Sequence, residues 1–491
     1  MNRTPSLLAR LAAPMLLMLA TIASGPAAAQ SAPDWSERPP RAPAPEFAPP
    51  EIERHTLSNG LDVWLVEKPG VPVAQIDLHV RVGSVDDGPN DGLARLTSDL
   101  MDEGAGDRDA LQLADAVEFL GIGLSTSASL HTVSVRLSTP VSKLDEALAL
   151  MADIALRPTF EQDDLDRVRT SRITALEQRR DEARSIAGVA LAEAVYPDHP
   201  YARLGSGTPA SLAAITRDDV ADFHAEYVRP SDAALVVVGA LDWDDVSDRV
   251  ETAFGSDAWS AREDAPARLG IPEPTQVGGR RLVLVDKPGA AQSVLRIGRV
   301  GTVRTSPDYY ALEVLNTILG GSFTSRLNQN LRERNGYSYG AGSSFTYRPV
   351  AGPFLAASDV QTDVTAPALT EFFRELAAIG ERVPDGELAK ARDFLALSFP
   401  SPFATVRGTA GAVRDLWFFG LSSEAMETYA EGVRSVTADD LERVAAEYVD
   451  PDAVVVVIVG DRAVIEDDVR ALDLGPVEVR SVEDVLGPAP E

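Results

Sequence analysis

The chain contains no cysteine among its 491 residues, and it has only five histidines. Without cysteine there are no disulfide bonds and no thiolate ligands for a metal, so the fold must depend on its apolar cores. No two histidines are spaced i, i+4, the spacing at which two side chains meet on one face of a helix. We expect each of them to be a surface or loop residue. The five are His55, His79, His131, His199 and His224.

Positive charge is also scarce. The chain has 45 Lys and Arg against 75 Asp and Glu, a formal net charge of −30. This balance argues against nucleic acid and anionic membrane surfaces as partners, and it permits attraction of basic peptides. Beyond the N-terminal segment, no apolar run approaches the 18 residues of a membrane-spanning helix.

The N-terminal 50 residues differ from the rest. Residues 1–29 combine two arginines, the apolar run 11–23 and a small-residue site, which predicts a secretory signal peptide cleaved after Ala29. The apolar run is too short for a membrane anchor, so we expect a periplasmic protein. Residues 30–50 are rich in Pro and Ala without periodicity, which predicts an extended tail.

The chain is similar to itself. Residues 216–246 match residues 437–469, with Thr216 aligned to Thr437 at an offset of 221 residues. Near the start of each half, "VEKPG" (66–70) matches "VDKPG" (285–289). The sequence therefore predicts a duplicated domain of about 220 residues.

Each half ends in the same pair of elements. Thr216 and Thr437 each stand three residues before an acid, the pattern of a helix N-cap. The apolar runs "AALVVVG" (233–239) and "AVVVVIVG" (453–460) predict central strands buried on both faces.

These patterns predict an α+β fold made twice. Each half is expected to form a mixed, mainly antiparallel sheet covered by helices. We place the N-terminal domain at 51–254 and the C-terminal domain at 280–485. Between them, residues 255–279 are rich in Pro, Gly and acids and read as a linker.

The stretch "GLARLTSDLM" (92–101) predicts a helix with leucines along one stripe. Arg95, Ser98 and Asp99 fall on another face, at i, i+3 and i+4. Three polar groups at this spacing are typical of a metal or acid/base site on a helix.

The order of these motifs resembles the M16 peptidase family, which includes pitrilysin, insulin-degrading enzyme and the mitochondrial processing peptidase. The resemblance is carried by residues 55–87, 92–101, 196–239 and 312–345, and it covers roughly residues 50–480. It implies two M16-type domains in one chain.

In active M16 members, the helix at 92–101 carries H-x-x-E-H, with two zinc-binding histidines around a Glu that activates water. Here those positions hold Arg95, Ser98 and Asp99. A guanidinium has no lone pair for a metal, and Ser is a poor general base. The third ligand, a Glu, would align with Ala175, or with Glu177 if the alignment shifts by two. We therefore predict a degenerate site with no zinc, and an i, i+4 ion pair between Arg95 and Asp99.

The resemblance also implies a functional pair in the second half. In active members an Arg and a Tyr seven residues apart contact the scissile peptide from the C-terminal half, and "LRERNGYSYG" (331–340) places Arg332 and Tyr339 at that spacing. Both side chains are donors that can hold a substrate carbonyl and stabilise an oxyanion. Arg334 and Tyr337 lie nearby at other spacings.

Taken with the resemblance, these residues imply a zinc-less subunit of a heterodimeric M16 metalloendopeptidase. A zinc-bearing partner with H-x-x-E-H would supply the metal, this chain would supply Arg332 and Tyr339, and the pair would degrade small peptides. The alternative is a non-enzymatic periplasmic scaffold or peptide-binding protein. Residues 121–138 would align with the edge strand that accepts substrate in active members, and here we expect a simple sheet edge.

Overall fold

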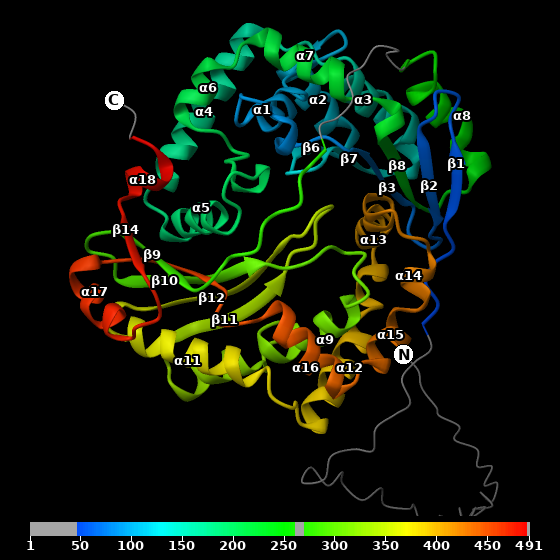
Figure 1. The fold of residues 1–491 in the computed structure, drawn as a ribbon. Helices are drawn as coiled ribbons and strands as arrows, with labels where there is room; N and C mark the ends of the chain where they lie inside the picture. The colour runs from blue at the N-terminus through cyan, green and yellow to red at the C-terminus, as the bar shows by residue number, and fades with distance from the viewer. Residues whose placement is uncertain (1–46, 261–269, 489–491) are drawn as a thin grey trace, which may run out of the picture. The chain divides into compact units, whose positions relative to one another are not determined.

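The computed structural model describes residues 47–260 and 270–488 (Figure 1). The predicted signal peptide 1–29 lies outside the described residues, as does the predicted tail up to residue 46. Within the described ranges no helix is long and apolar enough to cross a bilayer. Two six-stranded sheets dominate, one from each half of the sequence.

The first sheet has the order β1-β2-β8-β3-β7-β6. Its pairs are antiparallel except for β2 with β8, which run parallel. In chain order its strands are β1 (Glu53–Thr56), β2 (Asp62–Glu67), β3 (Val73–Val80), β6 (Gly123–Ala128), β7 (Val133–Pro140) and β8 (Ala233–Gly239). Of the segment 121–138, in which we expected a sheet edge, β6 forms one edge of the sheet and β7 lies next to it inside the sheet.

The second sheet repeats this plan with the order β11-β12-β10-β13-β9-β14. Here β9 pairs in parallel with both β13 and β14, and the other pairs are antiparallel. Its strands are β9 (Arg281–Asp286), β10 (Gln292–Val300), β11 (Ser338–Phe345), β12 (Pro353–Gln361), β13 (Val455–Gly460) and β14 (Val477–Arg480). A separate two-stranded ribbon joins β4 (Gly104–Ala105) to β5 (Arg108–Asp109).

The repeated ends of the two halves fold as the sequence predicts. Every residue of β8 and of β13 is buried, because both strands lie inside their sheets with helices on either side. The Thr216 and Thr437 hydroxyls each accept a backbone N–H three residues on, and both caps are capping boxes. The predicted α+β class with two mixed sheets is therefore confirmed.

One face of each sheet is covered by helices from its own half (Figure 1). Over the first sheet these are α1 (Leu93–Leu100), α2 (Ala110–Leu120), α3 (Leu144–Leu156), α4 (Gln162–Arg179), α6 (Pro209–Ala214), α7 (Arg217–Tyr227) and α8 (Trp243–Phe254). The second half contributes α9 (Tyr309–Leu319), α11 (Thr365–Ala378), α12 (Asp385–Ser398), α15 (Tyr429–Ser435), α16 (Ala438–Tyr448) and α17 (Arg462–Ala471). Shorter helices are α10 (Arg326–Asn328), α14 (Glu424–Glu427) and α18 (Val482–Leu486).

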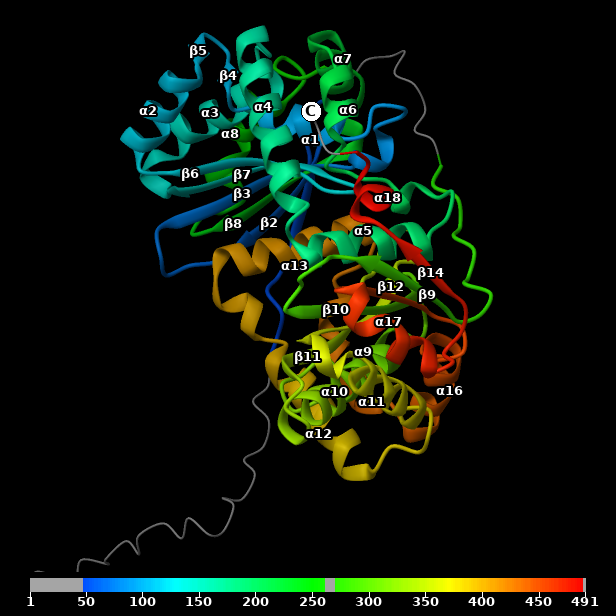
Figure 2. The ribbon, with the colours of Figure 1, turned by 90° about the vertical axis from the view of Figure 1, so that its left-hand side faces the viewer.

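The other face of each sheet is covered by a helix from the opposite half. Helix α5 (Ala183–Val195) packs on β10 and β13, and its Ile186 and Leu191 share a core with Val457. Helix α13 (Val406–Phe419) packs on β3 and β8 of the first sheet, and its Trp417 shares a core with Val236. Both helices lie between the two sheets in Figures 1 and 2.

The predicted linker 255–279 falls between α8 and β9. Its described residues form no helix or strand. Because α5 and α13 each cross to the opposite sheet, the two sequence halves share their packing, and the domain boundaries at 254 and 280 stay predictions.

Candidate functional site

Helix α1 begins at a tightly fixed point. Its N-cap, Gly92, has φ of 95°, and a Cβ there would lie 2.9 Å from the backbone of Gly207, so glycine is required. The buried Asp87 carboxylate accepts the backbone N–H groups of Gly92 and Ala94, each at 2.8 Å. Burial raises the pKa of Asp87 to about 7, against the opposing effect of these hydrogen bonds. This arrangement sets the direction of α1.

The polar face predicted for α1 is only partly formed. The leucines of the helix are buried as expected, and Arg95 is exposed. Ser98, in contrast, is fully buried, and its Oγ has no hydrogen-bond partner among the described residues. Ser98 therefore lies on the predicted stripe with Arg95 and Asp99, but packing encloses its side chain.

The expected ion pair between Arg95 and Asp99 is also wrong. Asp99 pairs instead with Arg172 of α4, so that the two helices are joined by a half-buried ion pair. Burial lowers the pKa of Arg172 to about 10, with repulsion from Arg95 and Arg179 in the same direction. Asp99 pairs with Arg172 and not with Arg95. Arg95 is exposed, and an ion pair is stronger where it is partly buried than at the surface.

Both candidates for a third ligand are exposed residues of α4. Ala175 is one turn beyond Arg172, and Glu177 follows it. In the described ranges there is no group of three or more His, Cys, Asp or Glu side chains that could hold a metal. A guanidinium, a buried hydroxyl, a methyl group and a carboxylate already bound by Arg172 do not fit zinc.

The Asp99→Asn substitution tests this interpretation of α1. Removing the charge should lower the free energy of unfolding by about 1 kcal/mol, because the pair is only half buried. Glu177→Gln, which removes a charge from the same region without breaking an ion pair, should stay within about 0.5 kcal/mol of the wild type. Urea unfolding with and without a chelator measures both. A midpoint that drops on chelation would show that a metal is bound here after all.

The histidines are less exposed than the sequence predicted. His79 is buried on β3 with its Nδ1 2.7 Å from Ser134 Oγ, and His224 on α7 lies with its Nε2 2.9 Å from a backbone carbonyl. His131 and His199 are in loops, as expected, but both are buried. Burial, with repulsion from neighbouring arginines, lowers the pKa of His79 to about 3, so its ring is neutral.

In the second half, Arg332 lies in a π-helical turn, η5 (Gln329–Arg334), that follows α10. Its guanidinium carbon is 4.7 Å from the centre of the exposed Phe323 ring, a cation–π contact. Its Nε is 3.4 Å from Glu333, and the side chain is 38% exposed. A π-turn is rare and often occurs at functional sites.

Three asparagines hold this turn in place. The buried Asn330 amide donates to Glu371 at 2.8 Å and to Glu375 at 2.7 Å, both on α11. The Asn335 amide donates to the Asn330 side-chain oxygen at 2.6 Å. Asn328 donates to the backbone before the turn. These hydrogen bonds were not predicted, although three asparagines within eight residues are visible in the sequence.

Tyr339 lies on β11, at the edge of the second sheet and directly after the π-turn. Its side chain is 93% exposed. Tyr337, two residues earlier, packs against the core, and its N–H donates to the Leu331 carbonyl at 2.8 Å. The sheet edge therefore presents Tyr339 to solvent and turns Tyr337 inwards.

Comparison with known proteins agrees with this architecture. Residues 62–207 match the family model described as insulinase (peptidase family M16), and residues 214–395 match the model described as peptidase M16 inactive domain. A protein named uncharacterized zinc protease from Mycobacterium leprae is 30% identical over 59% of this chain and 65% of its own length. A protein of the same description from Mycobacterium tuberculosis is 29% identical over 70% of this chain and 75% of its own length.

Solved structures show the same fold. A crystal structure of a peptidase M16 inactive domain from Pseudomonas fluorescens matches with a TM-score of 0.78 and 26% identity, over 83% of this chain and 98% of that one. A protease from Helicobacter pylori matches with a TM-score of 0.77 and 23% identity, over 84% of this chain and 100% of that one. With both family models matched in succession and this fold shared along most of its length, the chain belongs to the M16 peptidase (insulinase) family.

Proposed function

We propose that this chain is the zinc-less subunit of a heterodimeric M16 metalloendopeptidase. The observation that carries the proposal is the contrast between its two halves. In the first half, α1 has no metal-binding set, and Asp99 is bound by Arg172. In the second half, a π-turn carries Arg332, and the exposed Tyr339 follows seven residues later on β11.

The chemistry of the second half is that of a donor pair. The Arg332 guanidinium stays protonated at any physiological pH, and the Tyr339 hydroxyl is accessible to a ligand. Together they can donate to the carbonyl oxygen of a bound peptide and hold the negative charge that develops on it. The partner's zinc would supply the activated water. Preorganisation by the asparagines keeps Arg332 in place without help from substrate.

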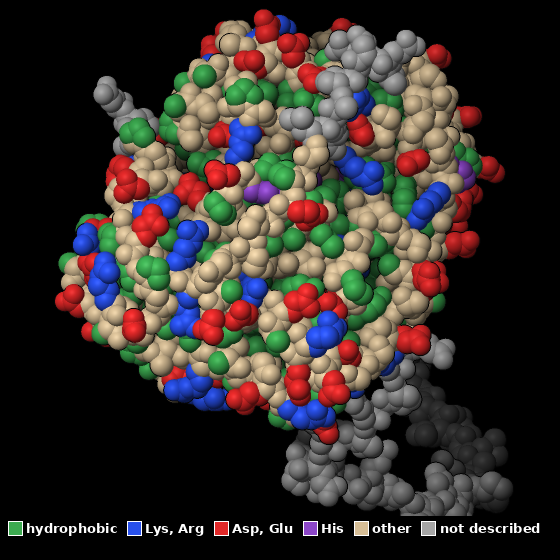
Figure 3. Space-filling view, in the orientation of Figure 1, with side chains coloured by type: hydrophobic (Ala, Val, Ile, Leu, Met, Phe, Trp, Pro, Cys, Tyr) green, Lys and Arg blue, Asp and Glu red, His purple; other side chains and the backbone are tan. Residues whose placement is uncertain are grey.

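The setting of the proposed complex follows from the sequence. The predicted signal peptide directs the chain to the periplasm, and the partner must be exported with it. On the face drawn in Figure 3, acidic and basic side chains are interspersed. The formal net charge of −30 nevertheless favours basic peptides as substrates.

Co-purification from the native periplasm through a C-terminal tag tests the proposal. We expect a second M16 chain with an intact H-x-x-E-H motif to be identified by mass spectrometry. The complex should cleave a fluorogenic peptide in a chelator-sensitive reaction, and neither chain should do so alone. Recovery of this chain by itself or with unrelated envelope proteins, and no cleavage, would instead indicate a scaffold or peptide-binding protein.

A further inference from the structure

A pocket of about 370 Å³ lies beside the π-turn, between α9, the turn and α12. Ser322 and Thr324 line it, and the residue between them is Phe323, on whose ring Arg332 is stacked. Two residues that line the pocket are therefore the sequence neighbours of Phe323, the ring that Arg332 contacts. Its volume suits one or two residues of a peptide.

The pocket carries local positive charge. Arg326, Arg334 and Lys390 line it with a single acid, Glu387. Glu387 forms an ion pair with Arg326, with 2.8 Å between Arg326 Nη2 and Glu387 Oε2. Lys390 donates to the Thr324 hydroxyl at 2.5 Å, and among the described residues neither Lys390 nor Arg334 has a carboxylate partner. Two cations are thus left uncompensated in a chain of net charge −30.

Exposed apolar side chains lie in and next to the pocket in sequence. Phe394 lines the pocket and is 49% exposed. Leu397, three residues later on α12, is 49% exposed, and Phe323, between the lining residues Ser322 and Thr324, is 64% exposed. Large apolar side chains are rarely left this accessible in a group without a ligand to cover them. A ligand that fits must therefore combine an anionic group with a large apolar group.

We propose that this pocket binds the C-terminal residue of a peptide, with its free carboxylate on Arg334 and Lys390 and a large apolar side chain against Phe394. The choice of the C-terminus follows from the charges. A basic peptide drawn to this acidic protein always keeps one carboxylate, at its C-terminus. Arg332 then meets a peptide bond a few residues upstream. That the ligand is a peptide rests on the proposed function.

Binding of labelled peptides to the purified chain alone, by fluorescence anisotropy, tests the pocket. The probes are a basic peptide ending in Leu with a free carboxylate, the same peptide as the C-terminal amide, and an amide with an internal Glu beside the Leu. We expect the amide to bind at least 10-fold more weakly than the acid. Arg334→Gln should reduce binding of the acid to the level of the amide and leave the amide unchanged.

Arg470→Gln is the matched control. It removes one exposed arginine from α17. This helix lies toward the β14 edge of the second sheet, and the pocket lies toward the opposite edge, β11. The substitution should therefore not change binding. Equal affinity for acid and amide, or an Arg334→Gln variant that binds like the wild type, would contradict the proposal that this pocket binds a peptide carboxylate. If the internal-Glu amide binds as tightly as the acid, the pocket accepts any carboxylate, and the proposal that it selects the C-terminus of the peptide is wrong. Since the assay needs no zinc partner, these results are independent of whether the heterodimer exists.

Discussion

Replacing Arg332 by Gln is expected to lower the turnover of the proposed heterodimeric peptidase by about 10²–10³-fold, the usual loss when one oxyanion donor is removed. Tyr339→Phe, which deletes only a hydroxyl, should have an effect of the same kind. The double variant should fall by less than the product of the two, because both donors act on one carbonyl. Turnover with a fluorogenic peptide at saturating concentration measures each.

The fold should tolerate these changes. The π-turn is held by the side chains of Asn330 and Asn335 and not by that of Arg332, and Tyr339 is 93% exposed. Size-exclusion chromatography should therefore find the complex intact. Tyr337→Phe, a loss of the same hydroxyl two residues away, serves as control and should keep full turnover. Wild-type turnover in the Arg332 and Tyr339 double variant would remove both residues from catalysis.

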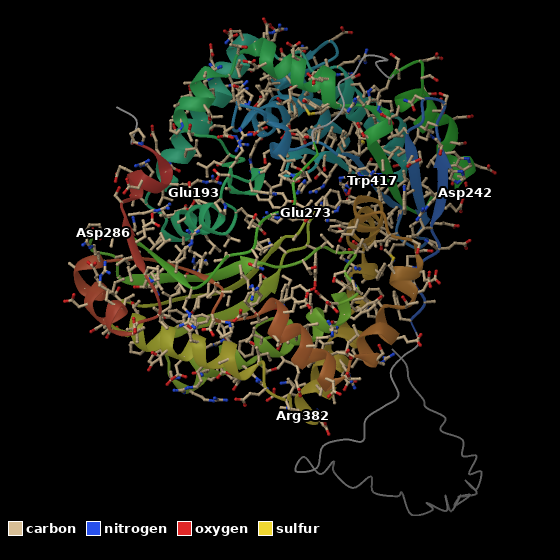
Figure 4. The ribbon with its side chains drawn as sticks, viewed as in Figure 1. Glu193, Asp242, Glu273, Asp286, Arg382 and Trp417 are labelled. Atoms are coloured by element: carbon tan, nitrogen blue, oxygen red, sulfur yellow. The ribbon has the colours of Figure 1, made fainter. Side chains whose placement is uncertain are left out.

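Trp417→Ala is expected to cost about 3–5 kcal/mol of stability, the range for truncating a large buried side chain. Trp417 is 4% exposed, on α13 where this helix meets the first sheet (Figure 4). The guanidinium of Arg81 lies 4.3 Å from its ring centre, and Arg81 also donates to its backbone carbonyl. The substitution removes the ring that anchors a second-half helix to the first half.

Urea unfolding followed by fluorescence and circular dichroism measures this loss. Phe419→Ala, two residues along the same helix and only half buried, is the control and should cost clearly less. If both variants lose the same free energy of unfolding, the loss comes from a weaker helix α13 and not from its packing on the first sheet.

The parts of the fold that depend on neighbouring residues could be predicted from the sequence. The capped helices after Thr216 and Thr437 and the buried strands β8 and β13 follow from local patterns that tertiary packing only reinforces. The edge position of β6 followed from the family resemblance.

What could not be predicted depends on distant partners. Asp99 had a basic residue four positions before it, but its partner is Arg172, 73 residues further on in the sequence and more favourably buried. The spacing along the helix puts Ser98 on the predicted polar face, but neighbouring elements bury it completely, and this burial could not be predicted from the spacing. The π-turn at Arg332 requires Glu371 and Glu375 from another helix, so its geometry is not encoded in its own six residues.

The exchange of α5 and α13 has a bearing on the history of the chain. The two helices hold equivalent places in the repeat, because each is the third α-helix after its half's last hairpin, and each covers the sheet of the other half. A two-fold homodimer whose subunits swap this one helix would have the same packing. Joining two such subunits end to end would keep this exchange of helices within one chain. The duplicated sequence is therefore what the fusion of such a swapped dimer would leave.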